Sequence, residues 1–216
     1  MRNELENCIE KFIIDDFQKY PGDFLKEQDI RSVLFTRIKD SLKNYRRKLP
    51  FEKLPKYPNE LNFEMDLVKS EYSYENYEGQ SRKAFDIAIL NNEEDVWIGK
   101  DVWEKYHQNK TRVAQMYWNQ PVRFGIEIKA GWHTWDTKKK ISGILSDRQK
   151  LQNYPKSDYC SKNFKDKNQN PYQFEGAAFL FSSHELYDNR FKESSIQIDG
   201  NCNAFCITPT RVYKIL

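Results

Sequence analysis

Apolar residues at helical spacing open the chain. Positions three and four apart are apolar over about residues 4–19, which predicts an amphipathic helix. Pro21-Gly22 ends that helix, and Asp23 is expected to cap a second one. Residues 46–58 contain three prolines and clustered bases, and they are predicted to form an exposed loop. The apolar stripe of the second helix consists of Ile30, Val33, Leu34, Ile38 and Leu42.

The hydrophobic period changes to two from Leu67 onward, as is typical of half-buried strands. The strand that starts there and a strand over Lys83–Leu90 flank a turn at residues 78–81, which predicts a hairpin. Residues 91–120 show no clean period and are predicted to insert one or two helices. The polar segment 155–171 is expected to be a mobile loop. The remaining predictions are strands over 122–130, 172–183 and 203–208, and helices over 137–153 and near 184–193.

This order of elements predicts an α/β fold, a mixed β-sheet flanked by helices in a single domain over residues 1–216. Residues 1–66 would form the N-terminal helices and the basic loop, and residues 67–208 the core. The chain has 216 residues, which is enough for one sizeable core. Its longest clean apolar run, residues 176–181, is far shorter than the ~20 residues that a membrane-spanning helix needs.

The number and spacing of the cysteines favour a reducing, intracellular compartment. The four cysteines are too few and too scattered for a disulfide scaffold, and their spacing matches no common zinc site. Small buried core thiols are therefore favoured over a metal site. The acidic start, with Glu4, Glu6 and Glu10, differs from a secretory signal, so a cytoplasmic protein is expected.

Two predicted strands carry charged residues among apolar ones. In 122–130, Glu127 and Lys129 share the polar face because strand side chains alternate. In Lys83–Leu90, Asp86 lies opposite an apolar face of Phe85, Ile87 and Ile89. If the two strands pair, Asp86, Glu127 and Lys129 converge on one patch. A plainer interpretation is a surface strand with exposed charges on its polar face.

Two carboxylates held close on a rigid sheet repel unless a cation lies between them. A hard divalent ion such as Mg²⁺ or Mn²⁺ suits such a pair, because it prefers carboxylate, water and phosphate oxygens. Lys129 could then hold or deprotonate a water molecule against a phosphate. The residues therefore predict a metal-assisted phosphodiesterase site.

This pattern resembles the PD-(D/E)XK nuclease superfamily, which has a restriction-endonuclease-like core. Asp86 in Phe-Asp-Ile-Ala-Ile-Leu and the triplet Glu127-Ile128-Lys129 carry the resemblance. It implies that Asp86 and Glu127 are metal carboxylates and that Lys129 is the catalytic lysine. It also places Ile128 at the metal site.

The resemblance further implies that Glu27 matches a first-helix acid at the metal site. Glu27 could equally be a first-turn carboxylate favoured by the helix dipole. The chain departs from the family pattern in two ways. Phe85 stands where the family often has proline, and the long gap between Asp86 and Glu127 implies an insertion near 91–120.

The near-neutral net charge of +3 hides a division along the chain. Residues 60–104 carry a net charge of −8, whereas residues 36–58 and 138–167 carry +6 each. Basic surface attracts phosphates, so DNA is the expected partner and a homodimer is left open. The candidate DNA-contacting residues are Arg46, Arg47, Lys48, Lys138, Lys139 and Lys140.

The expected function is that of a magnesium-dependent deoxyribonuclease, an endonuclease of the restriction or repair kind. The alternative is a non-catalytic nucleic-acid-binding or interaction module that retains a nuclease-like fold.

Overall fold

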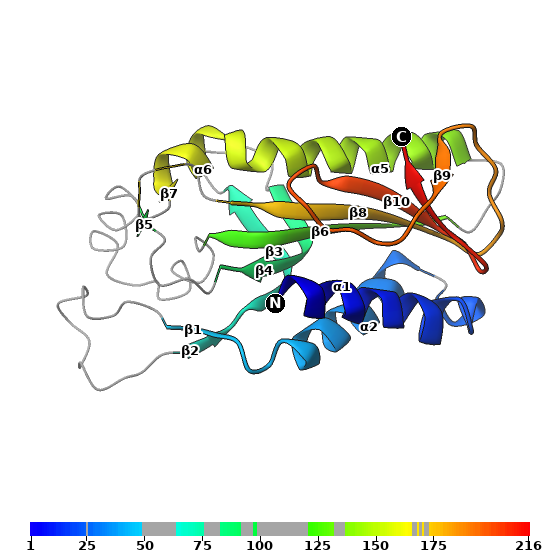
Figure 1. Cartoon of the computed structure of the whole chain (residues 1–216), viewed down its shortest axis with the longest axis horizontal. Helices are drawn as coiled ribbons and strands as arrows, with labels where there is room; N and C mark the ends of the chain where they lie inside the picture. Colours follow the sequence, from blue (N-terminus) through cyan, green and yellow to red (C-terminus); the bar gives the residue numbers. More distant parts are fainter. Residues whose placement is uncertain are drawn as a thin grey trace.

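A mixed seven-stranded sheet forms the centre of the molecule (Figure 1). The computed structural model describes residues 1–24, 26–48, 64–75, 83–91, 97–98, 121–131, 137–165, 168, 170 and 173–216. In spatial order the strands are β3 (Val68–Glu75), β4 (Lys83–Leu90), β6 (Val122–Gly131), β8 (Glu175–Ser182), β10 (Asn203–Ile207), β11 (Val212–Ile215) and β9 (Phe191–Glu193).

The strands β3, β4 and β6 form an antiparallel meander, as the predicted hairpin requires. The strands β6, β8 and β10 run parallel, and β11 and β9 then continue antiparallel. Parallel neighbours need a crossover connection, and helix α5 (Thr137–Asn153) lies between β6 and β8 along the chain. The α/β prediction with a mixed sheet is therefore confirmed.

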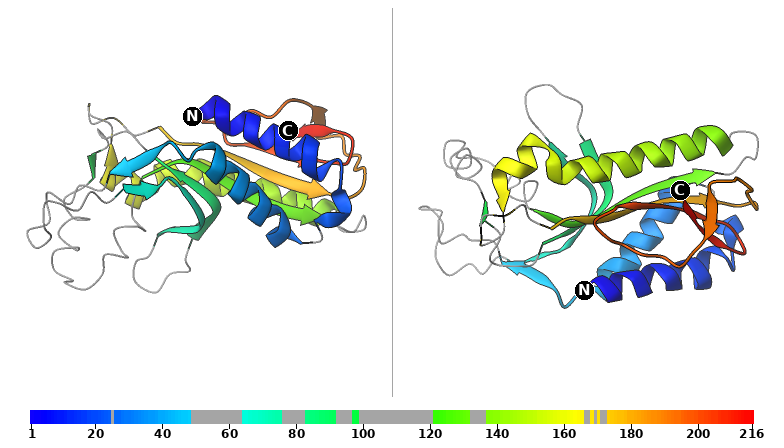
Figure 2. Two further views of the ribbon diagram at one scale, coloured as in Figure 1. Left: turned by 90° about the horizontal axis from the view of Figure 1, so that it is seen from below. Right: turned by 45° about the horizontal axis from the view of Figure 1, so that its top comes forward.

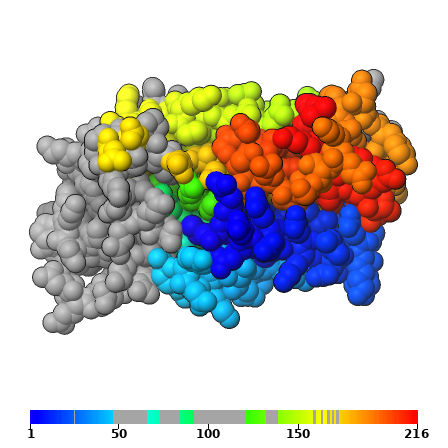
Figure 3. All heavy atoms as spheres, viewed as in Figure 1, coloured from blue at the N-terminus to red at the C-terminus, as the bar shows by residue number. Residues whose placement is uncertain are grey.

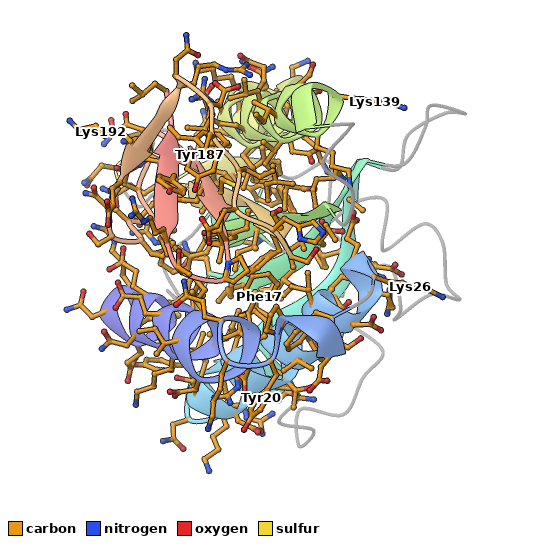
Figure 4. The ribbon with its side chains drawn as sticks, turned by 90° about the vertical axis from the view of Figure 1, so that its right-hand side faces the viewer. Phe17, Tyr20, Lys26, Lys139, Tyr187 and Lys192 are labelled. Carbon is orange, nitrogen blue, oxygen red and sulfur yellow. The ribbon has the colours of Figure 1, made fainter. Side chains whose placement is uncertain are left out.

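Helices cover both faces of the sheet (Figures 1 and 2). On one face lie α1 (Arg2–Lys11), a π-helical turn (Phe12–Phe17) and α2 (Glu27–Ser41), and α5 lies on the other. The N-terminal helices also lie directly against the C-terminal third of the chain (Figure 3). Phe12 and Phe17 pack on Phe181 of β8 with ring centroids 5.8 and 4.9 Å away, and Figure 4 shows Phe17 in the interior. These aromatic contacts anchor the N-terminal layer.

Four shorter strands form two small sheets beside the main one. β1 (Arg46–Lys48) pairs with β2 (Glu64–Asp66), and β5 (Trp97–Ile98) pairs with β7 (Phe164–Lys165). The prediction that residues 46–58 are a loop is wrong for Arg46–Lys48, because backbone pairing with β2 makes them a strand. The predicted helices in 91–120 lie almost wholly outside the described residues, and Trp97–Ile98 is a strand.

Local capping differs from the prediction at the start of α2. Asp23 lies in a short 3₁₀ turn (Pro21–Asp23), and Lys26 precedes the helix instead. The carboxylate of Asp29 accepts a hydrogen bond of 2.8 Å from the Lys26 N–H. Of the predicted apolar stripe, Val33 is exposed, because helical periodicity places it to one side of the four buried members.

The C-terminal half also departs from its predictions in three places. Part of the expected loop 155–171 is ordered, with a 3₁₀ turn (Tyr154–Lys156) followed by α6 (Asp158–Asn163) and β7. Burial of Tyr154, Cys160 and Phe164 explains this order in a polar segment. Residues 184–193 contain no helix and end in β9, and the unpredicted β11 pairs with it.

All four cysteines are free and buried, as core thiols were predicted to be. Burial raises the pKa of the Cys202 and Cys206 thiols to about 12, so both stay protonated at neutral pH. Within the described part of the chain, none of the helices has both the length and the apolar character needed to cross a membrane.

Two glycines offer a matched test of this packing. A Cβ atom on Gly125 of β6 would lie 2.8 Å from Phe174 Cζ and 2.9 Å from Leu151 Cδ2, whereas one on Gly143 of α5 would meet nothing within 4 Å. We expect Gly125→Ala to destabilise the fold by about 1–3 kcal/mol through overpacking. Gly143→Ala should stabilise it by about 0.5–1 kcal/mol, because alanine favours a helix. Urea unfolding measures both, and equal effects would contradict this packing.

Candidate functional site

The site lies where the ladder between β4 and β6 ends. Ile87 pairs with Ile126, and Asp86 and Glu127 are the next residues along the two strands. Beyond that point the main-chain N–H of Ile128 donates a hydrogen bond of 2.7 Å to Oδ2 of Asp86. The Asp86 carboxylate therefore serves as acceptor for a strand N–H, and the two predicted carboxylate residues come together at the centre of the sheet.

The regular alternation of β4 breaks at Asp86. Ile87 shares the face of its partner Ile126, whereas Phe85 reaches the opposite face, beside Gly125 and Leu151. The Phe85 ring packs there against Tyr154, with centroids 5.1 Å apart. The predicted apolar face of Phe85, Ile87 and Ile89 is therefore wrong for Phe85, because the ring joins the aromatic cluster under α5.

The neighbouring strand β3 is irregular at the same level. The register is the same at Ser70–Ile87 and at Tyr72–Phe85, but Glu71 between these pairs has φ of +50°. A left-handed conformation is costly for a residue with a Cβ and is found mostly where surrounding contacts impose it. The Glu71 carboxylate makes one such contact, an ion pair with Arg31.

Arg31 of α2 links these two irregular positions. Its Nη2 lies 2.7 Å from Oε1 of Glu71, and its Nη1 lies 3.4 Å from Oδ1 of Asp86. Nη2 also donates to the side chain of Gln28. The Arg31 side chain is only 14% exposed, and its buried Nε has no hydrogen-bond acceptor among the described residues. One buried guanidinium thus neutralises carboxylates on two strands.

The Glu127 carboxyl group pairs with a lysine of α5, on the face of the sheet opposite α2. Nζ of Lys150, on α5, donates a hydrogen bond of 2.6 Å to Oε1 of Glu127 and a second one to the carbonyl of Ala84. Burial raises the pKa of Glu127 to about 8, and the Asp86 and Asp147 carboxylates add to this, although Lys150 opposes it. Glu127 therefore binds a proton far more readily than an exposed glutamate does.

Lys129 lies between two acids. Its Nζ is 3.2 Å from Oδ2 of Asp147 and 3.9 Å from Oε1 of Glu27. Burial alone would lower the pKa of Lys129, but the Asp147 and Glu27 carboxylates outweigh it and raise that pKa. Lys129 is therefore a cation at neutral pH.

Glu27 lies at the start of a helix and beside the other charged residues. It is the first residue of α2, and its carboxylate also faces Lys129. Burial raises the pKa of Glu27, and the Asp86 and Asp147 carboxylates reinforce the rise while Lys129 opposes it. Glu27, like Glu127, therefore binds a proton more readily than an exposed glutamate does.

Together these residues form what we call the charge cluster. It contains five carboxylates (Glu27, Glu71, Asp86, Glu127 and Asp147) and three cations (Arg31, Lys129 and Lys150). Fully ionised, it carries two excess negative charges. Oxygen donors and this excess suit a divalent cation such as Mg²⁺, which proteins bind through one or two carboxylates, water and phosphate. Among the described residues, no three acidic, histidine or cysteine side chains converge as a ready ligand set.

Four members of the charge cluster were missed by the sequence reasoning. Arg31 lies four residues after Glu27 and so shares its helix face, which is a usable signal. Asp147 interrupts the inward stripe between Ile144 and Leu151, and Lys150 lies three residues after it, which is a second signal. Nothing in the sequence marks the left-handed conformation of Glu71.

The predicted DNA-contacting residues lie in two separate places. Arg46 pairs with Asp66 in the β1–β2 sheet, and Arg47 and Lys48 follow it on β1, with side chains outside the described residues. Lys138 and Lys139 lie at the start of α5, where Lys139 is exposed (Figure 4). Nζ of Lys140 donates a hydrogen bond of 3.2 Å to the carbonyl of Ala130 on β6. Lys140 thus contacts β6 at the residue that follows Lys129.

Comparison with protein-family models, with curated proteins and with solved structures found no match for this chain.

The raised pKa of Glu127 predicts a specific pH dependence of stability. Between its ordinary pKa of 4.5 and about 8, folded Glu127 keeps a proton that the unfolded chain has lost. The free energy of unfolding should therefore fall as pH rises through this window, by at most about 1.4 kcal/mol per pH unit. The glutamine in Glu127→Gln cannot titrate, so the free energy of unfolding of this variant should increase relative to that of the wild type as pH rises. Urea unfolding across the window checks this, and parallel curves for the two proteins would contradict it.

Proposed function

We propose that this protein is a metal-dependent nuclease that hydrolyses DNA phosphodiester bonds, acting as an endonuclease. The observation that carries the proposal is the juxtaposition of Asp86, Glu127 and Lys129 at the end of the β4–β6 ladder. A metal-assisted phosphodiester site needs this combination of adjacent carboxylates and a cation. The proposal extends to a cytoplasmic protein of the restriction or repair kind.

Asp86 and Glu127 would hold the divalent ion, Mg²⁺ or Mn²⁺, with Ile128 and Glu27 as the further metal-site residues that the family resemblance implies. The bound ion would supply Lewis-acid stabilisation of charge on the phosphate. Asp86 is pre-positioned by the Ile128 N–H at 2.7 Å. Ionisation of Glu127 is opposed by its burial, so a cation at the site would favour its charged form.

Lys129 is suited to donate hydrogen bonds and not to remove a proton. The raised pKa keeps its ammonium group charged, and such a group stabilises negative charge that develops on a phosphate or on an attacking water. Asp147 at 3.2 Å orients the ammonium group. Of the two roles considered for Lys129, holding the water is therefore favoured.

The fold is consistent with the family resemblance that motivates the proposal. Helix α2, three antiparallel strands, helix α5 and the parallel strand β8 follow one another in the order that the resemblance implies. Exposed Lys139 and the β1 residues Arg46–Lys48 would contact DNA phosphates outside the charge cluster.

Cleavage of plasmid DNA in Mg²⁺ or Mn²⁺ tests the proposal. We expect the wild type to cut, and Asp86→Asn and Lys129→Met to lose at least about a hundredfold in rate, because each removes a group needed at the reacting phosphate. Lys192→Ala is the matched control, since Lys192 is exposed on the edge strand β9 (Figure 4). It should cut like the wild type.

Equal cleavage by all four proteins would show that the nuclease activity does not arise from this site. DNA binding without cleavage by the wild type would overturn the proposal in favour of the non-catalytic binding module.

A further inference from the structure

Arg31 makes two unequal ion pairs in the charge cluster. The guanidinium lies 2.7 Å from Glu71 but 3.4 Å from Asp86. The longer contact is the one to the carboxylate that the proposed function assigns to the metal. Loss of the Asp86 contact therefore leaves the stronger Glu71 contact in place.

The position of Arg31 works against a cation at Asp86. Like charges repel steeply at short range in a partly buried site, so a divalent ion on Asp86 competes with the guanidinium 3.4 Å away. Arg31 is 14% exposed, which limits screening by water. A cation can bind to Asp86 at lower cost when the guanidinium withdraws.

Glu71 offers the place to which the guanidinium can withdraw. It is two-thirds exposed and has φ of +50°, and it lies on β3 between the ladder pairs Ser70–Ile87 and Tyr72–Phe85, with its carboxylate 2.7 Å from Arg31. Among the residues that the structure describes, the Nε of Arg31 has no acceptor, so the contacts of the guanidinium are all made through Nη1 and Nη2. The ion pair with Glu71 thus holds Arg31 beside Asp86 and not in direct contact with the proposed metal position.

We propose that Arg31 is a positioning residue that competes with the divalent cation for Asp86, and that Glu71 holds it partly withdrawn. This inference rests on the proposed function, because it assigns the regulation of the same metal site. Arg31 and Glu71 should then have opposite effects on metal affinity. A purely structural role for the pair would make both substitutions act in the same direction.

Calorimetric titration with Mn²⁺ alone tests the proposal. Arg31→Met removes the competing charge and should tighten Mn²⁺ binding by about tenfold or more. Glu71→Gln frees Arg31 for Asp86 and should weaken binding severalfold. In the double variant that combines Arg31→Met with Glu71→Gln, the Glu71→Gln substitution should weaken Mn²⁺ binding little further, because its effect is transmitted through Arg31. Arg37→Met is the control, because Arg37 lies on the same helix and pairs with Asp16 at 2.6 Å, outside the charge cluster.

Arg31→Met binding Mn²⁺ no more tightly than the wild type would overturn the proposal. If Arg31→Met does not fold, Glu71→Gln decides, and unchanged or tighter binding by that variant overturns it. Failure of the inference alone would appear as wild-type DNA cleavage with unchanged affinities in the variants. Absence of both cleavage and Mn²⁺ binding in every protein would overturn the inference and the proposed function together.

Discussion

A carboxylate buried at the centre of a sheet is costly unless a cation compensates it, and this constraint organises the molecule. Asp86 and Glu127 follow directly on the last ladder pair of β4 and β6, so two carboxyl groups lie next to each other. Two helices supply the compensation: Arg31 of α2 pairs with Asp86, and Lys150 of α5 pairs with Glu127. Lys129 of β6 pairs with the neighbouring acids Asp147 and Glu27. Ion pairs therefore connect α2 and α5, which lie on opposite faces of the sheet, to two adjacent positions on β4 and β6.

The same ion pairs set what the site can bind. Each central carboxylate already has a protein partner, so an incoming cation must redistribute existing pairs and does not meet free ligands. Glu127 illustrates this, because its raised pKa shows that Lys150 does not fully offset the burial of its charge. A divalent ion at this site, as the proposed function requires, would favour the ionised form of Glu127. Structural and chemical requirements therefore fall on the same few side chains.

The sequence pattern was sufficient where local periodicity and burial agree. The predicted helix over 137–153 has the observed bounds of α5, and the charged face of β6 placed Glu127 and Lys129 together. It was insufficient where tertiary contacts override the local pattern. Phe85 leaves its expected face to join Tyr154, and Glu71 adopts a left-handed conformation that glutamate rarely favours. Asp147 lies on the inward apolar stripe of its helix, where a charged residue is unexpected. The helical periodicity of the sequence is therefore enough to single it out as a candidate site residue.

The proposed function requires the charge cluster to bind a divalent cation through Asp86 and Glu127. A crystal structure of the wild-type protein grown with Mn²⁺, with anomalous scattering data, would reveal such an ion. We expect an anomalous peak bonded to both carboxylates, with Arg31 withdrawn toward Glu71. An anomalous map without a peak at this site, with Asp86 still paired to Arg31 and Glu127 to Lys150, would contradict it.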